Sequence, residues 1–148
     1  MTYADASFLV SLYLRDTNSG KAAAYLERRP QPLAFTPLQR HELRNMIRQL
    51  VFRTKGERDP ITDSDAQAAL SQIDEDIGSG KLFEQPLPWS EVMMASERIG
   101  KAHTSTLGVR GLDLLNVAAA VAIKSRVLLT FDTRQRAVAQ AVGLQVKP

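Results

Sequence analysis

The stretch from Arg110 to Asp132 constrains the fold of this chain more than any other. Its first part, Leu112 to Ile123, is apolar on nearly every side and predicts a buried helix. Asp113 and Asn116 are the polar residues within it, and at about 100° per residue they fall on one stripe. A carboxylate on a buried helix is costly unless a cation or hydrogen-bond donors accompany it. The helix therefore predicts an acidic pocket.

Two acids follow candidate strands. Residues 128–130 form a short apolar strand that leads to Asp132, and a helix is expected over 133–142. Residues 1–4 form a similar strand that stops at Asp5, before a helix over 6–14. Because ligands bind outside the C-terminal ends of the strands in an open α/β sheet, we expect both acids at that edge.

The rest of the chain alternates between the same two kinds of element. Further helices are predicted over 19–29, 37–54, 62–77 and 90–103, and further strands over 33–35, 82–83 and 144–146. Strands separated by helices predict an α/β fold with a mainly parallel central sheet of four or five strands. The length of 148 residues, with no linker or low-complexity segment, predicts a single domain over residues 1–148.

A further acid comes from the helix over 37–54. With Leu43 at the centre of its apolar face, Glu42 falls on the shoulder of that face, from which a side chain can reach a cleft. Each acid alone has a simpler reading, because Asp5 and Asp132 could merely cap helices and Glu42 could be solvated. Asp113 fits such a reading least, since its helix is otherwise so apolar.

Taken together, the four carboxylates indicate a cation site. They would repel one another unless a cation neutralised them. Oxygen ligands without any cysteine suit Mg²⁺ or Mn²⁺. Such an ion activates water and stabilises charge on a phosphate, so the pattern predicts phosphodiester hydrolysis.

Charge and composition agree with a polyanionic partner. The formal net charge is +3 and the isoelectric point is about 9.4. The N-terminus lacks the pattern of a signal peptide, and no apolar run is long enough to span a membrane. With no cysteine present, we expect a cytoplasmic protein that does not associate with membranes.

Four segments resemble the PIN-domain ribonucleases, in particular the VapC-type toxins of bacterial toxin–antitoxin modules. They are YADAS at residues 3–7, TPLQRHE at 36–42, RGLDLLN at 110–116 and LLTFD at 128–132. The resemblance implies a PIN-like α/β/α sandwich and an endoribonuclease that depends on Mg²⁺ or Mn²⁺. It also implies an RNA substrate, a homodimer and a VapB-like antitoxin that inhibits the toxin.

The resemblance also assigns roles to residues. The metal-binding and catalytic acids would be Asp5, Glu42, Asp113 and Asp132, with Ser7 and Thr130 as hydroxyl supports and Asn116 in the position that is His in many relatives. Arg110 is a candidate to bind a substrate phosphate or to pair with an acid. Arg44, on a basic helix face with Arg40 and Arg48, either binds phosphates or is simply solvated.

Other functions remain as alternatives. A catalytically inactive PIN-like module that binds RNA or protein would have the same fold, although the presence of all four acids favours an enzyme. A receiver-like domain would need a phosphoacceptor aspartate on a middle strand, which the chain lacks. A phosphatase with a nucleophilic aspartate would want Asp-x-Asp, where this chain has Asp5 and Ser7.

Overall fold

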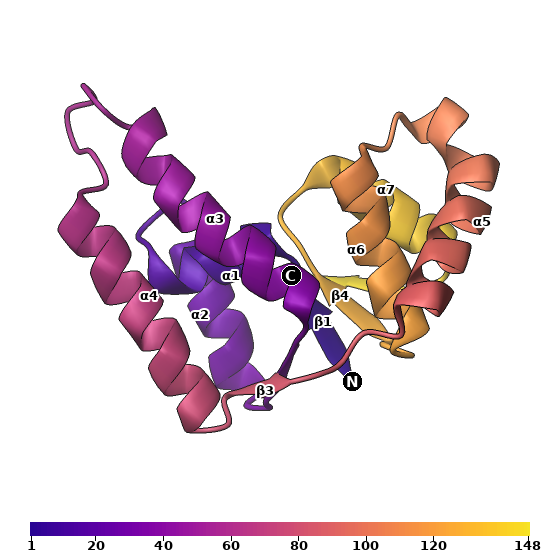
Figure 1. Cartoon of the computed structure of the whole chain (residues 1–148), viewed down its shortest axis with the longest axis horizontal. Helices are drawn as coiled ribbons and strands as arrows, with labels where there is room; N and C mark the ends of the chain where they lie inside the picture. Colours follow the sequence, from indigo (N-terminus) through magenta and orange to yellow (C-terminus); the bar gives the residue numbers. More distant parts are fainter.

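A computed structural model describes residues 1–148 as a five-stranded sheet between two layers of helices (Figure 1). The strands are β1 (Thr2–Ala4), β2 (Leu33–Phe35), β3 (Leu82–Glu84), β4 (Val127–Leu129) and β5 (Gln145–Lys147). The helices are α1 (Ala6–Tyr13), α2 (Ser19–Arg28), α3 (Pro37–Arg53), α4 (Asp63–Gly78), α5 (Trp89–Leu107), α6 (Gly111–Ala122) and α7 (Thr133–Ala141). The predicted α/β sandwich is confirmed, and every predicted helix and strand is present.

The sheet is entirely parallel, with the strand order β3-β2-β1-β4-β5. Strands β2 and β3 are added in turn on one side of β1, and β4 and β5 are added on the other side. The order in which strands are added to the sheet therefore reverses between β1 and β4. In parallel sheets the crevice at the C-terminal end of such a reversal is where ligands bind.

Each face of the sheet carries its own core. Helices α1 to α4 cover one face, where Phe8, Ile47 and Ile73 are fully buried. Helices α5 to α7 cover the other, where Val117 of α6 and Val138 of α7 are fully buried (Figure 1). None of the seven helices combines the length and apolar character needed to cross a bilayer.

Most boundaries lie within one residue of the prediction, and two of the differences concern the end of α5 and the turn before Asp132. Helix α5 continues four residues beyond His103, to Leu107, and ends where Gly108 adopts a left-handed conformation with φ of 63°. Strand β4 ends one residue early, at Leu129. Thr130 and Phe131 therefore form the turn that leads to Asp132, rather than the end of the strand.

Candidate active site

Asp5 directly follows β1, and three donors hold its side chain. The residue is 3% exposed. Its Oδ1 accepts hydrogen bonds from the Ser7 hydroxyl at 2.7 Å and from the Phe8 backbone N–H at 2.8 Å, which caps α1. Its Oδ2 accepts from the Thr130 hydroxyl at 2.6 Å. The carboxylate is thus fixed in place at the C-terminal end of β1.

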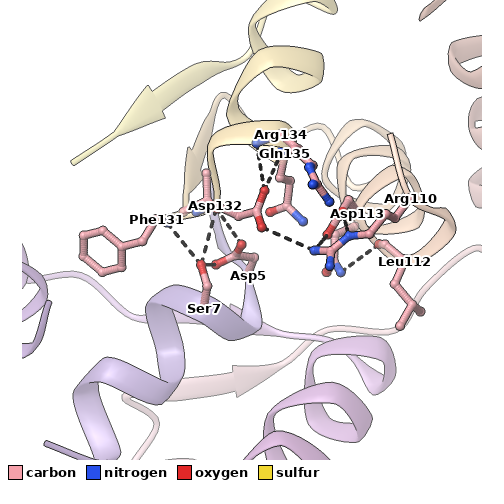
Figure 2. A network of polar contacts seen from close by, with 11 residues as sticks. Asp5, Ser7, Arg110, Leu112, Asp113, Phe131, Asp132, Arg134 and Gln135 are labelled. Atoms are coloured by element: carbon pink, nitrogen blue, oxygen red, sulfur yellow. Dashed lines mark hydrogen bonds and ion pairs between the residues drawn. The ribbon is translucent and has the colours of Figure 1, made fainter. Parts of the chain in front are cut away.

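The same two hydroxyls position Asp132 beside Asp5. The Thr130 hydroxyl accepts from the Asp132 backbone N–H at 2.9 Å, and the Ser7 hydroxyl accepts from the Phe131 N–H at 3.1 Å (Figure 2). Asp132 Oδ1 then accepts from the first backbone N–H groups of α7, at 2.8 and 2.9 Å. Asp132 therefore caps α7 with one oxygen and directs the other toward the crevice.

Arg110 joins Asp132 to Asp113. Its guanidinium donates to Asp113 from Nε at 2.7 Å and from Nη2 at 3.3 Å, and Nη2 also lies 3.3 Å from Asp132 Oδ2 (Figure 2). Asp113 is buried, whereas the Arg110 side chain is 61% exposed. Of the two roles open to Arg110 from the sequence, the structure shows the pairing with acids.

Glu42 reaches the same crevice from α3. Its Oε2 accepts a hydrogen bond from Asn116 Nδ2, which also donates to the carbonyl of Leu112 at 3.1 Å. Asn116 Oδ1 in turn accepts from the Tyr3 hydroxyl at 2.7 Å. Tyr3 is fully buried, and its role in the site was not predicted from the sequence. A tyrosine on a buried strand two residues before Asp5 was the available signal, because its hydroxyl needs a partner.

The pKa values of Asp5 and Glu42 are raised, mainly by burial and to a smaller extent by neighbouring negative charges. Burial raises the pKa of Asp5 from 3.8 to about 6, against the hydrogen bonds from Thr130, Phe8 and Ser7 that lower it, and the charge of Asp132 raises it further. Burial likewise raises the pKa of Glu42 from 4.5 to about 6. The Asn116 hydrogen bond opposes this shift, whereas the charges of Asp5 and Asp113 add to it.

The donor chemistry of this cluster fits a hard divalent cation. It offers carboxylate oxygens, and a bound cation would offset both the burial of Asp5 and Glu42, which is the main cause of their raised pKa values, and the smaller effect of the neighbouring negative charges. In the structure Asp113 and Asp132 form ion pairs with Arg110, and Glu42 accepts a hydrogen bond from Asn116. Accordingly, no group of three or more Asp, Glu or His side chains is arranged to hold a metal ion.

Arg44 lies apart from the acids. Its Nη1 pairs with Asp74 of α4 at 2.8 Å, and neighbouring Arg40 pairs with Glu84. Both arginines, together with Arg48, line a groove of about 670 Å³ beside the end of β3. None of the four acids lines this groove, so the structure places Arg44 on a separate basic surface.

The strand order, with acids gathered where it reverses, defines a PIN-like α/β/α fold. Comparison with solved structures agrees. The chain matches VapC20 of Mycobacterium tuberculosis, described as a sarcin–ricin loop cleaving toxin, with a TM-score of 0.70 and 14% identity over 100% of both chains. It matches FitAcB from Neisseria gonorrhoeae with a TM-score of 0.68 and 16% identity, over 100% of this chain and 97% of the other.

A third solved structure is similar over the whole chain. VapBC2 from Rickettsia felis, bound to a DNA fragment from their promoter, matches with a TM-score of 0.63 and 13% identity, over 99% of this chain and 98% of the other. No family model matches the sequence, and no curated protein is significantly similar to it. At these identities the comparisons establish the fold, which is the PIN-domain fold of the VapC-type toxins.

Proposed function

We propose that this protein is a metal-dependent endoribonuclease, a VapC-like toxin that hydrolyses phosphodiester bonds of RNA. One observation carries the proposal above all others: where the strand order reverses, Thr130 connects Asp5 to Asp132 and Arg110 connects Asp132 to Asp113. The fold shared with VapC20, which is described as a toxin that cleaves the sarcin–ricin loop, supports the same activity.

The acids would act as ligands for Mg²⁺ or Mn²⁺. Asp5, Asp113 and Asp132 would hold the principal ion, and Glu42 would complete the set through a water molecule or a second ion. When bound, such an ion activates water and stabilises the negative charge that develops on the phosphate. Hydrolysis would leave a 3′-hydroxyl and a 5′-phosphate.

The neighbouring residues would hold these acids in place. Ser7 and Thr130 fix Asp5 by donating to its two carboxylate oxygens, and Asn116, held by Tyr3, orients Glu42. A residue held by buried hydrogen bonds keeps its ligand atoms aligned at little further entropic cost.

Arg110 would have a second role. Its exposed guanidinium neutralises Asp113 and Asp132, and it is free to turn toward a substrate phosphate once a cation satisfies those acids. Its planar fork suits bidentate contact with phosphate oxygens. Arg44 would bind a phosphate farther along the RNA, beyond the acids.

The protein would also be controlled by assembly. We propose a homodimer and a VapB-like antitoxin that silences the toxin. The likeness to FitAcB and to VapBC2, which was solved bound to a DNA fragment from their promoter, supports an antitoxin partner. Co-expression with the product of a neighbouring gene, followed by purification of the complex and assay of its nuclease activity, tests this part of the proposal.

The catalytic proposal is tested by removing single charges. Asp5→Asn and Asp113→Asn each keep the size of the side chain, so both variants should fold as the wild type does. We expect both to lose cleavage of RNA in Mg²⁺ or Mn²⁺ by at least about 100-fold. Asp63→Asn, on an exposed turn of α4, is the matched control and should cleave normally. Undiminished cleavage by both site variants would remove the mechanism.

The alternative is a catalytically inactive PIN-like module that binds RNA or protein. The two possibilities separate when RNA is incubated with the wild type in Mg²⁺, in Mn²⁺ and in EDTA. The enzyme produces fragments in the metal ions and none in EDTA, whereas the inactive module retains RNA without cutting it in any of the three.

A further inference from the structure

A second basic surface lies on α2 and is unrelated to Arg44. A groove between α2 and the end of β5 is lined by Lys21, Tyr25, Arg28, Arg29 and Lys147. An adjoining groove shares Tyr25 and Arg29 and adds Arg126, at the start of β4. We refer to the five basic residues of these two grooves, Lys21, Arg28, Arg29, Arg126 and Lys147, as the α2 patch.

The positive charge of the α2 patch is uncompensated. All five side chains are exposed, and none takes part in a salt bridge. No aspartate or glutamate lines either groove, and Glu27 of α2 lines a different groove beside Asp76. Five positive charges exceed the formal net charge of +3 for the chain, so the remainder of the molecule is acidic on balance. The groove lined by Arg40, Arg44 and Arg48 differs in this respect, because Arg40 pairs with Glu84 and Arg44 with Asp74.

The patch begins next to the acidic cluster. The carbonyl of Lys147 accepts a hydrogen bond from the backbone N–H of Thr130 at 3.0 Å, and the Thr130 hydroxyl donates a hydrogen bond to Asp5. The adjacent Pro148 oxygen accepts from Arg136 at 3.2 Å. From there the patch follows α2, where Lys21 and Arg28 are separated by a rise of about 10 Å. It leads from the catalytic edge toward the start of β4.

An aromatic side chain lies in the middle of the patch. Tyr25 is half-buried, with the Arg29 guanidinium 5.8 Å from its ring centroid and the ring of Phe8 packed edge-on at 6.2 Å. In proteins that bind single-stranded nucleic acid, a positive groove follows the sugar–phosphate backbone and aromatic rings stack against the bases. A membrane would require a contiguous apolar surface in addition, and the patch residues are charged.

We propose that the α2 patch is an accessory RNA-binding surface that holds the phosphates of the substrate beyond the scissile bond. The inference rests on the proposed ribonuclease activity, because it extends the path of the same substrate. If the patch holds RNA in this way, binding of long RNA depends on charges that lie outside the acidic cluster. Cleavage of an oligonucleotide too short to reach the patch does not depend on them.

The test compares two triple variants. Lys21→Gln/Arg28→Gln/Lys147→Gln removes three charges of the patch, and Arg58→Gln/Arg98→Gln/Lys101→Gln removes three exposed charges elsewhere. Binding of a stem-loop RNA with single-stranded tails is measured in EDTA over a range of salt concentrations. We expect the slope of log affinity against log salt to fall by about two to three for the patch variant alone, because each phosphate contact contributes about 0.7 to 0.9.

The remaining outcomes overturn the inference. Equal slopes for the wild type and the patch variant show that RNA does not use this surface, and equal losses in both triple variants show only an effect of net charge. A loss confined to duplex DNA of the same length assigns the patch to DNA instead. Binding is measured in EDTA and does not depend on cleavage. If the wild type failed to cut any RNA in Mg²⁺, the proposed function would be contradicted, but the binding data would still show whether the α2 patch holds RNA.

Discussion

At the scale of single residues, the buried carboxylate of Asp5 makes the stability of the protein depend on pH. Its pKa is about 6 in the folded chain against an ordinary value of 3.8, so the folded state binds the proton more tightly than the unfolded state. The stabilisation from this group is complete below about pH 4 and is lost as the pH rises through about 6. Glu42, whose pKa is also raised to about 6 by burial, contributes in the same direction.

We therefore predict that, in EDTA, the free energy of unfolding is lower at about pH 7.5 than at about pH 5, by about 2 kcal/mol. Urea titrations at a series of pH values measure the difference. Asp5→Asn should remove about half of it and leave the contribution of Glu42, because the amide does not ionise yet still caps α1. The exposed substitution Asp63→Asn should leave it in place. A stability that rises over this range in the wild type would contradict the prediction.

The positions of the acids followed from local signals, whereas their partners did not. Asp5 and Asp132 each follow a short apolar strand and cap the next helix, which two or three adjacent residues reveal. The hydrogen bond between Tyr3 and Asn116 joins residues 113 positions apart in the sequence, and no local sequence pattern predicts such a contact. Arg110 was identified as a candidate, but its bridge to Asp132 depends on how α6 lies against the turn after β4.

At the scale of elements, the first turn of α3 fixes Glu42 relative to β1. Thr36 and Gln39 form a capping box at the start of this helix. Gln39 is fully buried, accepts from the Thr36 backbone N–H at 2.7 Å and donates to the carbonyl of Ala4 at 2.6 Å. One side chain thus ties the start of α3 to the end of β1, immediately before Asp5.

Gln39→Met should destabilise the protein because it keeps the volume of the side chain and removes both hydrogen bonds. A buried N–H and a buried carbonyl then lose a partner, at a cost of about 2 to 4 kcal/mol in the free energy of unfolding. Urea denaturation measures it. Gln140→Met, on an exposed position of α7, is the control and should change stability little. Equal stabilities for the two variants would show that the tie between α3 and β1 is not needed.

Element boundaries were predictable where a capping residue marks them. Thr36 and Thr62 each open a helix at the expected residue, because a hydroxyl before a helical run is a local and specific signal. The last turn of α5 was not predicted, since it contains Thr104, Ser105 and Thr106, which favour helix weakly. Packing of Leu107 against the core under α5 to α7 overrides that local preference.

At the scale of the whole molecule, the acidic cluster lies where the two helical layers meet. Glu42 comes from α3 on one face of the sheet, whereas Asp113 of α6 and Asp132 before α7 come from the other face. Asp5 lies between them at the end of the central strand β1. The layers have separate hydrophobic cores, so a ligand held by acids from both faces would add a connection across the sheet edge.

Binding of Mg²⁺ or Mn²⁺ should therefore stabilise the whole fold. An ion that binds only the folded state adds about 2.7 kcal/mol to the free energy of unfolding when its concentration is about 100 times its dissociation constant. Urea titrations with metal and with EDTA measure this gain without any RNA. Asp113→Asn should lose most of the gain because it removes the charged ligand supplied by α6, whereas Asp63→Asn should retain it. If Asp113→Asn gained as much stability as the wild type, the ion would not bind between the two layers.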